Sequence, residues 1–122
     1  IRNLNRVRPP FNVNRLAQAA AIACMDDSEH VKCSVESNTK GKQYLYAELG
    51  KMDITYWETE ANFILLDTKK DGNDIYKKLL QQGIIVRPMK GMYKWEGHLR
   101  VTIGTQEQNK RFIEGLKTAL AS

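Results

Sequence analysis

Residues 83–105 read GIIVRPMKGMYKWEGHLRVTIGT. Two short, β-branched apolar runs lie near the ends of this stretch, at 84–86 and 99–103, and each is bounded by glycine or proline. Runs of this length and composition predict buried β-strands. The segment 89–98 between them contains two glycines and two aromatic residues. We expect it to be a loop that covers either a ligand, the core or another subunit.

Each apolar run is associated with one arginine, because Arg87 follows the first run and Arg100 lies inside the second. A guanidinium is always charged, so within a buried strand it needs an anionic partner. Its planar fork can hold a carboxylate or a phosphate through two hydrogen bonds. Two interpretations stay open: the arginines form an anion site, or they are solvated or paired with acidic side chains of the same chain.

The composition indicates one soluble domain with a modest core, since the chain has 122 residues, of which 42% are hydrophobic and 27% charged. No apolar run approaches the roughly 20 residues that span a bilayer. The net charge of +5 permits an acidic ligand, but interleaved acidic residues argue against nucleic-acid binding. Cys24 and Cys33 lack metal-ligand spacing and are expected to be free thiols in a reducing cytoplasm.

Patterns elsewhere in the chain predict the other elements. Pro9 and Pro10 should end a short basic helix. Asn14 should cap an alanine-rich helix that packs in the interior or at an interface. A long helix should begin within 26–29 and run through 49, and strands are predicted at 54–57 and 61–67. A further helix at 74–82 should be capped by Asp71 or Asn73 and ended by Gly83. The last predicted helix begins with a capping box at 105–108 and runs to about 120.

The predicted fold class is an α/β (α+β) sandwich, in which helices pack on a small, mainly antiparallel or mixed sheet. No paired carboxylates, Ser-His-Asp pattern, zinc spacing or glycine-rich phosphate loop is found. We expect His98 to be structural and Lys90 and Lys94 to be solvated. Asn62 could present its amide to a ligand or satisfy backbone groups where its strand begins.

Four strings carry a resemblance that covers nearly the whole chain. They are RPPFNVN at 8–14 followed by AQAA at 17–20, EANF at 60–63, GIIVRPM at 83–89 and LRVTIGT at 99–105. In this order they resemble the histidinol-phosphate aminotransferases, and more narrowly the C-terminal small domain of these enzymes. That family belongs to the class I and II pyridoxal-phosphate (PLP) aminotransferases of fold type I.

The resemblance implies a cytoplasmic homodimer in histidine biosynthesis. Such an enzyme converts histidinol phosphate and 2-oxoglutarate to imidazole-acetol phosphate and glutamate. It implies that Arg100 binds the anionic group of the substrate, that Arg87 holds the same end, and that Asn62 lies near this site. It assigns no catalytic, cofactor-binding or metal-binding residue to this chain.

The resemblance also implies a domain division, with an interdomain helix end and linker at 1–13 and the small domain at 14–122. The chain lacks an initiator methionine, and residues 1–4 look like a helix already under way, which suggests an excised part of a longer protein. PLP and its Schiff-base lysine would belong to a large domain upstream. We therefore expect this chain alone to be inactive.

Two other functions stay open at the level of sequence. One is a related aminotransferase or a threonine-phosphate decarboxylase of the same branch. The other is a free-standing α/β domain that binds a small anion. Each retains the arginine pair as a binding site, and they differ in whether a Ser-Lys motif lies upstream of the chain.

Overall fold

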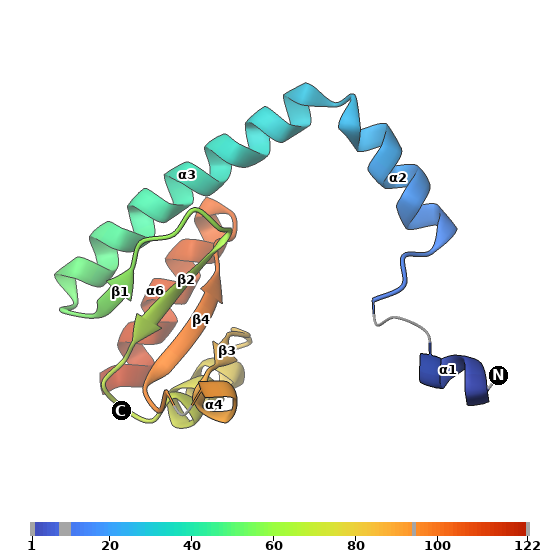
Figure 1. The fold of residues 1–122 in the computed structure, drawn as a ribbon. Helices are drawn as coiled ribbons and strands as arrows, with labels where there is room; N and C mark the ends of the chain where they lie inside the picture. The colour runs from blue at the N-terminus through green and yellow to red at the C-terminus, as the bar shows by residue number, and fades with distance from the viewer. Residues whose placement is uncertain (1, 8–10, 94, 122) are drawn as a thin grey trace. The chain divides into compact units, whose positions relative to one another are not determined.

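A computed structural model describes residues 2–7, 11–93 and 95–121, in two units that meet between Ser34 and Val35. Figure 1 shows the helices and strands of each unit. The helix α3, Ser28–Lys51, runs through the boundary and contributes to both units. The predicted helix stop at Pro9 and Pro10 lies outside the described residues.

The first unit contains α1 (Arg2–Val7), α2 (Arg15–Met25) and the start of α3. Asn14 is the N-cap of α2 as predicted, because its Oδ1 accepts the N–H of Ala17 at 2.9 Å. Among the described residues, the alanine-rich α2 buries none of its side chains, so they do not provide the predicted interior position. The alternative expectation, that α2 lies at an interface, remains a prediction.

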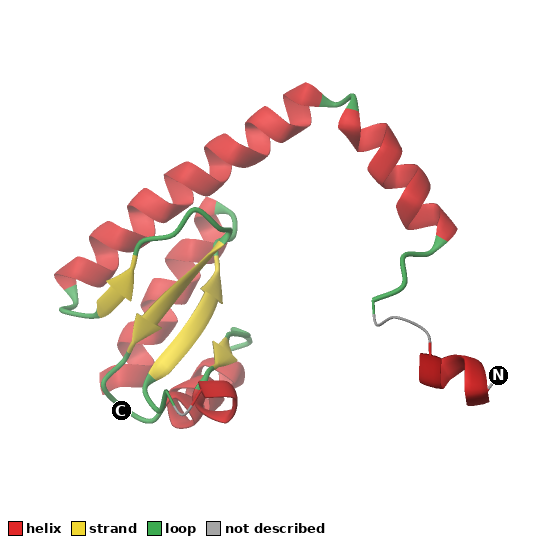
Figure 2. Ribbon diagram, viewed as in Figure 1, coloured by secondary structure: helices red, strands yellow, loops and turns green. Residues whose placement is uncertain are grey.

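The second unit is built on a four-stranded antiparallel sheet with the order β1-β2-β4-β3 (Figure 2). Its strands are β1 (Thr55–Trp57), β2 (Phe63–Asp67), β3 (Arg87–Pro88) and β4 (His98–Thr102). The helices α4 (Gly72–Gln81) and α6 (Gln106–Ala121) join it, and α6 runs behind β2 and β4 (Figure 1). The predicted α/β class with a small antiparallel sheet is confirmed.

One face of the sheet forms the core. Alternate strand residues Ile64, Leu66, Leu99 and Val101 are at most 5% exposed, as expected for the side of a sheet that helices cover. The core cluster also includes buried residues of α3, α4 and α6, namely Leu45, Leu49, Ile75, Leu79, Phe112, Ile113, Leu116 and Ala119. The opposite face of the sheet does not contribute these core residues.

The helix ends follow the predicted capping chemistry. Asp71 is the N-cap of α4 and accepts the N–H of Asn73 at 2.8 Å. Gly83 follows α4 with a φ of +73°, a left-handed conformation that glycine adopts without strain. Before α6, Thr105 N–H donates to Gln108 Oε1 at 2.9 Å and Gln108 N–H donates to Thr105 Oγ1 at 3.3 Å, which is a capping box.

The predicted strand at 84–86 is wrong, because pairing with β4 is confined to Arg87 and Pro88. The reason lies at the end of α4. Ile84 N–H still donates to Leu79 O at 3.0 Å, so the chain remains attached to the helix and reaches the edge of β4 only at Arg87. An apolar, β-branched composition alone does not indicate that a residue is held by a hydrogen bond to the preceding helix.

The predicted loop at 89–98 contains a short helix, α5 (Lys90–Tyr93). None of the helices in the part of the chain that the structure describes combines the length and apolarity needed to cross a membrane.

Candidate functional site: an arginine pair on the open sheet face

The register of the sheet places both predicted arginines on its open face. Arg87 is the direct partner of Arg100, and Arg100 is the partner of Leu65. Leu65 in turn pairs with Trp57 on β1. Cross-strand partners project to the same side, and this row alternates with the core residues Leu66 and Leu99. The structure therefore brings Arg87 and Arg100 together, away from the core.

Two positive charges directly opposite each other destabilise a sheet unless an anion lies between or above them. Partners in an antiparallel pair have Cβ atoms about 4.5–5.5 Å apart, so both guanidinium groups can reach one anionic group. Among the residues that the structure describes, no carboxylate forms an ion pair with Arg100. For Arg100, this excludes the interpretation in which the guanidinium is paired with an acidic side chain of the described residues.

Phe63 supports Arg100 from the neighbouring strand. The Arg100 guanidinium carbon lies 4.9 Å from the centre of the Phe63 ring, within the range of a cation–π contact. Arg100 is half-buried and Arg87 is exposed. The stacked guanidinium keeps its in-plane N–H donors available, so the contact orients Arg100 without using the groups that would bind a carboxylate or phosphate.

His98 lies on the same face within an aromatic group. Its ring stacks on Trp57 at a centroid distance of 5.3 Å and lies 5.2 Å from the ring of Trp95. Its Nδ1 atom is buried and has no hydrogen-bond partner. This environment is consistent with the structural role expected for His98. Trp95 packs on the sheet through His98, so this part of the 89–98 segment covers the protein's own strands.

Asn62 is not brought to the arginine pair. It lies on an exposed bend just before β2, where its carbonyl accepts the N–H of Ile103 at 2.8 Å. Leu65, the partner of Arg100, is three residues further along, which corresponds to about 10 Å of strand. This bond is made by the main chain and does not involve the side-chain amide, so both roles considered for the Asn62 amide stay predictions.

Asn109 positions the end of β4 and was not singled out in the sequence. It is 2% exposed. Its Oδ1 accepts the N–H of Gly104 at 2.9 Å, and its Nδ2 donates to the carbonyl of the same residue at 3.0 Å. An amide side chain supplies both functions at once. The available signal was a polar residue one helical turn before Phe112 and Ile113, on the face that packs inward.

α3 approaches this corner at Gly41. A Cβ atom there would lie 2.6 Å from Ile103 Cγ2 and 2.9 Å from Asn109 Nδ2. The glycine in the middle of a long helix is therefore explained by packing rather than by flexibility. It lets the helix lie against the segment that follows Arg100.

Lys90 is ion-paired and 36% of its side chain is exposed, so the expectation that it is solvated holds only in part, and Lys94 lies outside the described residues. Its Nζ lies 2.5 Å from Oδ2 of Asp71, the N-cap of α4. Hydrogen bonding from Lys90, followed by the N–H of Asn73, lowers the pKa of Asp71, and the same pair raises the pKa of Lys90. This ion pair ties α5, which follows β3, to the start of α4.

We expect Asp71→Asn to lower the urea midpoint of unfolding at neutral pH. Asparagine retains the capping function, so the change isolates the ion pair. Because the folded-state pKa of Asp71 is lowered, the stabilisation is present above the unfolded pKa of about 4 and is lost as the pH falls through the folded value. The difference between wild type and variant should therefore shrink below about pH 4.

Asp74→Asn serves as the control for this titration, because Asp74 forms an exposed ion pair with Lys77. Exposed pairs contribute little to stability. A wild-type advantage over Asp71→Asn that persists unchanged to pH 2 would contradict the assignment.

A family model described as aminotransferase class I and II matches residues 1–116. The chain belongs to this family. It is 49% identical over 121 residues to histidinol-phosphate aminotransferase of Moorella thermoacetica, covering 99% of this chain and 31% of the relative. Against the enzyme of the same name from Caldicellulosiruptor saccharolyticus it is 44% identical, over 98% of this chain and 33% of the relative.

Solved structures share the fold of this aminotransferase chain. Histidinol-phosphate aminotransferase from Clostridium acetobutylicum matches with a TM-score of 0.80 at 24% identity, over 98% of this chain and 37% of the other. The enzyme from Sinorhizobium meliloti, solved in complex with pyridoxal-5'-phosphate, matches with a TM-score of 0.79 at 20% identity, over 98% and 34%. The chain thus spans about a third of the length of the relatives it matches.

The family implies PLP. PLP enzymes of this kind hold the cofactor through a lysine. The cavity lined by residues of 83–86, the end of β4 and the start of α6 contains no lysine in its lining. Lys90 is engaged by Asp71, and Lys42, with 14% of its side chain exposed, donates to Thr59 O at 2.9 Å.

Proposed function

We propose that this chain is the C-terminal small domain of a histidinol-phosphate aminotransferase and that it binds the anionic end of the substrate. The observation that carries the proposal is the cross-strand pair of Arg87 and Arg100 on the open sheet face. Relatives of that name at 49% and 44% identity over nearly the whole chain support the choice of branch.

The pair suits both halves of the proposed reaction. One substrate pair carries a phosphate, in histidinol phosphate and imidazole-acetol phosphate. The other carries the distal carboxylate of glutamate or 2-oxoglutarate. Both groups are planar or tetrahedral anions that accept paired hydrogen bonds from guanidinium groups. One site with two arginines can therefore bind each substrate in turn by the same end.

In this proposal the arginines position the substrate and do not move protons. PLP, when bound elsewhere in the protein, carries the amino group between the two substrates. Binding the anion on a rigid strand fixes the distance from that end of the substrate to the reacting carbon, which reduces the entropy cost of the reaction. The stacking of Arg100 on Phe63 limits the freedom of the guanidinium before substrate arrives.

The remaining partners are proposed from the exposed apolar residues of the first unit. Leu16, Ile22 and Met25 of α2 are 83%, 69% and 85% exposed. Apolar surface of this extent calls for a covering partner. We assign that role to the large domain of the same protein. In this proposal residues 1–13 are the linker between the two domains and residues 14–122 are the small domain. The assembled enzyme is proposed to be a cytoplasmic homodimer.

The direct test is a titration of the 122-residue chain with inorganic phosphate and with histidinol phosphate, followed through the Nε–Hε NMR signals of the arginines. The signals of Arg87 and Arg100 should shift together and saturate with one dissociation constant. Arg15, exposed at the start of α2, should not respond. Equal, unsaturable shifts of all arginines would show that no specific anion site exists.

A further inference from the structure

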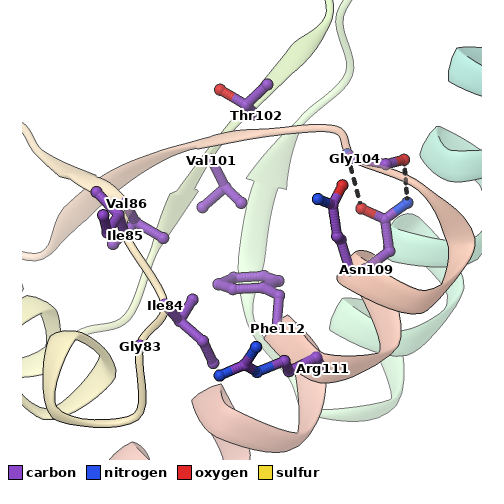
Figure 3. Close-up of a pocket in the computed structure, with 11 residues that line it drawn as sticks. Gly83, Ile84, Ile85, Val86, Val101, Thr102, Gly104, Asn109, Arg111 and Phe112 are labelled. Carbon is purple, nitrogen blue, oxygen red and sulfur yellow. Dashed lines mark hydrogen bonds between the residues drawn. The ribbon is translucent and has the colours of Figure 1, made fainter.

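A cavity of about 380 Å³ lies between residues 83–86, the end of β4 and the start of α6. It opens where residues 83–86 separate from β4 before joining it at Arg87 (Figure 3). The start of α6 closes its other side. All of its lining residues belong to the second unit. Its volume is at the lower end of the range for small-molecule sites.

The floor of the cavity is apolar. Ile84, Val86, Val101 and Phe112 contribute to its lining, and Figure 3 shows the Phe112 ring beneath Val101 with Ile84 beside it. Val86, Val101 and Phe112 are at most 8% exposed. A ligand for this space must therefore have an apolar body of branched aliphatic or aromatic shape.

Two of the polar side chains in the lining are already engaged. Asn109 holds the backbone of Gly104 through both its amide groups, and Gln108 Oε1 accepts the N–H of Thr105. Arg111 also forms a hydrogen bond, from its Nη2 to Gln82 O at 2.8 Å. It differs from Asn109 and Gln108 because a guanidinium has several N–H donors and this bond uses only one of them. No acidic residue lines the cavity. The lining therefore carries the positive charge of Arg111 and no negative charge that would balance it.

Thr102 adds backbone groups at the edge of the cavity. Ile103 N–H donates to Asn62 O on the β2 side of β4. Because successive residues of a strand alternate the side to which their peptide groups point, the N–H and C=O of Thr102 point to the β3 side. The segment 84–86, which would pair there if β3 continued, has separated. A peptide donor is therefore directed toward the same space as the guanidinium.

We propose that this cavity is a second ligand site, for a small apolar monocarboxylate. The hydrocarbon body lies on Ile84, Val101 and Phe112, and the carboxylate is bound by the Arg111 guanidinium at the mouth. The site is distinct from the arginine pair, because neither Arg87 nor Arg100 belongs to its lining.

The proposal is tested by titrating the 122-residue chain with benzoate, and with benzyl alcohol as the neutral molecule of similar shape. The methyl signals of Ile84 and Val101 and the amide signal of Thr102 report on the cavity in NMR spectra. Benzoate should shift these signals saturably and bind about tenfold more tightly than benzyl alcohol, since the charged contact with Arg111 is made only by the carboxylate.

Arg111→Met should reduce benzoate affinity to that of benzyl alcohol and leave benzyl alcohol unaffected. Lys110→Met is the matched control, because Lys110 is exposed on the same helix and does not line the cavity; it should change neither affinity. Arg100→Met should also leave benzoate binding intact. The proposal is overturned if Arg111→Met leaves the ratio of the two affinities unchanged, if benzoate binding requires Arg100, or if neither probe shifts the cavity signals.

Discussion

Arg100→Met in the full-length aminotransferase is expected to lower kcat/KM for histidinol phosphate by at least about 30-fold, which corresponds to about 2 kcal/mol of lost binding. The half-buried guanidinium lies opposite Arg87, and no described carboxylate pairs with it. Removing it leaves the substrate phosphate with one arginine and with less charge compensation. Steady-state kinetics with histidinol phosphate and 2-oxoglutarate measure the effect.

The loss should fall mainly on KM, because in the proposed site the arginine binds a part of the substrate that does not react and so stabilises ground state and transition state alike. Arg100→Lys should recover only part of the affinity, since an ammonium group keeps the charge without the planar fork. Lys110→Met, on the exposed face of α6, is the control for a general change in charge. Wild-type kcat/KM in Arg100→Met would remove the arginine pair from the substrate site.

The sequence singled out Arg87 and Arg100, because each lies in or beside a short β-branched run. It left open whether they form an anion site, and their direct cross-strand pairing is known only from the register of the sheet. The capping residues Asn14, Asp71 and Thr105 were predictable, because each cap involves atoms within three residues.

The errors arose where distant residues decide the local structure. Residues 84–86 have strand composition, but the bond from Ile84 to Leu79 keeps them on α4. Lys90 was expected to be solvated because its partner, Asp71, is 19 positions away. The sequence did not indicate Asn109, because the hydrogen bonds between its side chain and the backbone of Gly104 form only in the folded chain. Propensity contains no term for such contacts, which exist only after the strands have paired.

Leu99→Ala is expected to lower the free energy of unfolding of the second unit by about 3 kcal/mol. Leu99 is fully buried in β4, between His98 and Arg100, and pairs with Leu66 on one side and Pro88 on the other. Truncation removes apolar contacts and leaves a cavity at the middle of the sheet. Urea unfolding followed by far-UV circular dichroism measures the change.

The matched control is Leu80→Ala, because Leu80 is 44% exposed on α4. It removes the same atoms without creating an enclosed cavity and should cost less than about 1 kcal/mol. If Leu99→Ala leaves the chain unfolded, Leu99→Met, which keeps the side-chain volume, should restore folding at a cost below about 1.5 kcal/mol. Equal effects of Leu99→Ala and Leu80→Ala would mean that β4 is not packed in the core. The backbone that presents Arg100 would then lack the rigidity required of a substrate-binding strand.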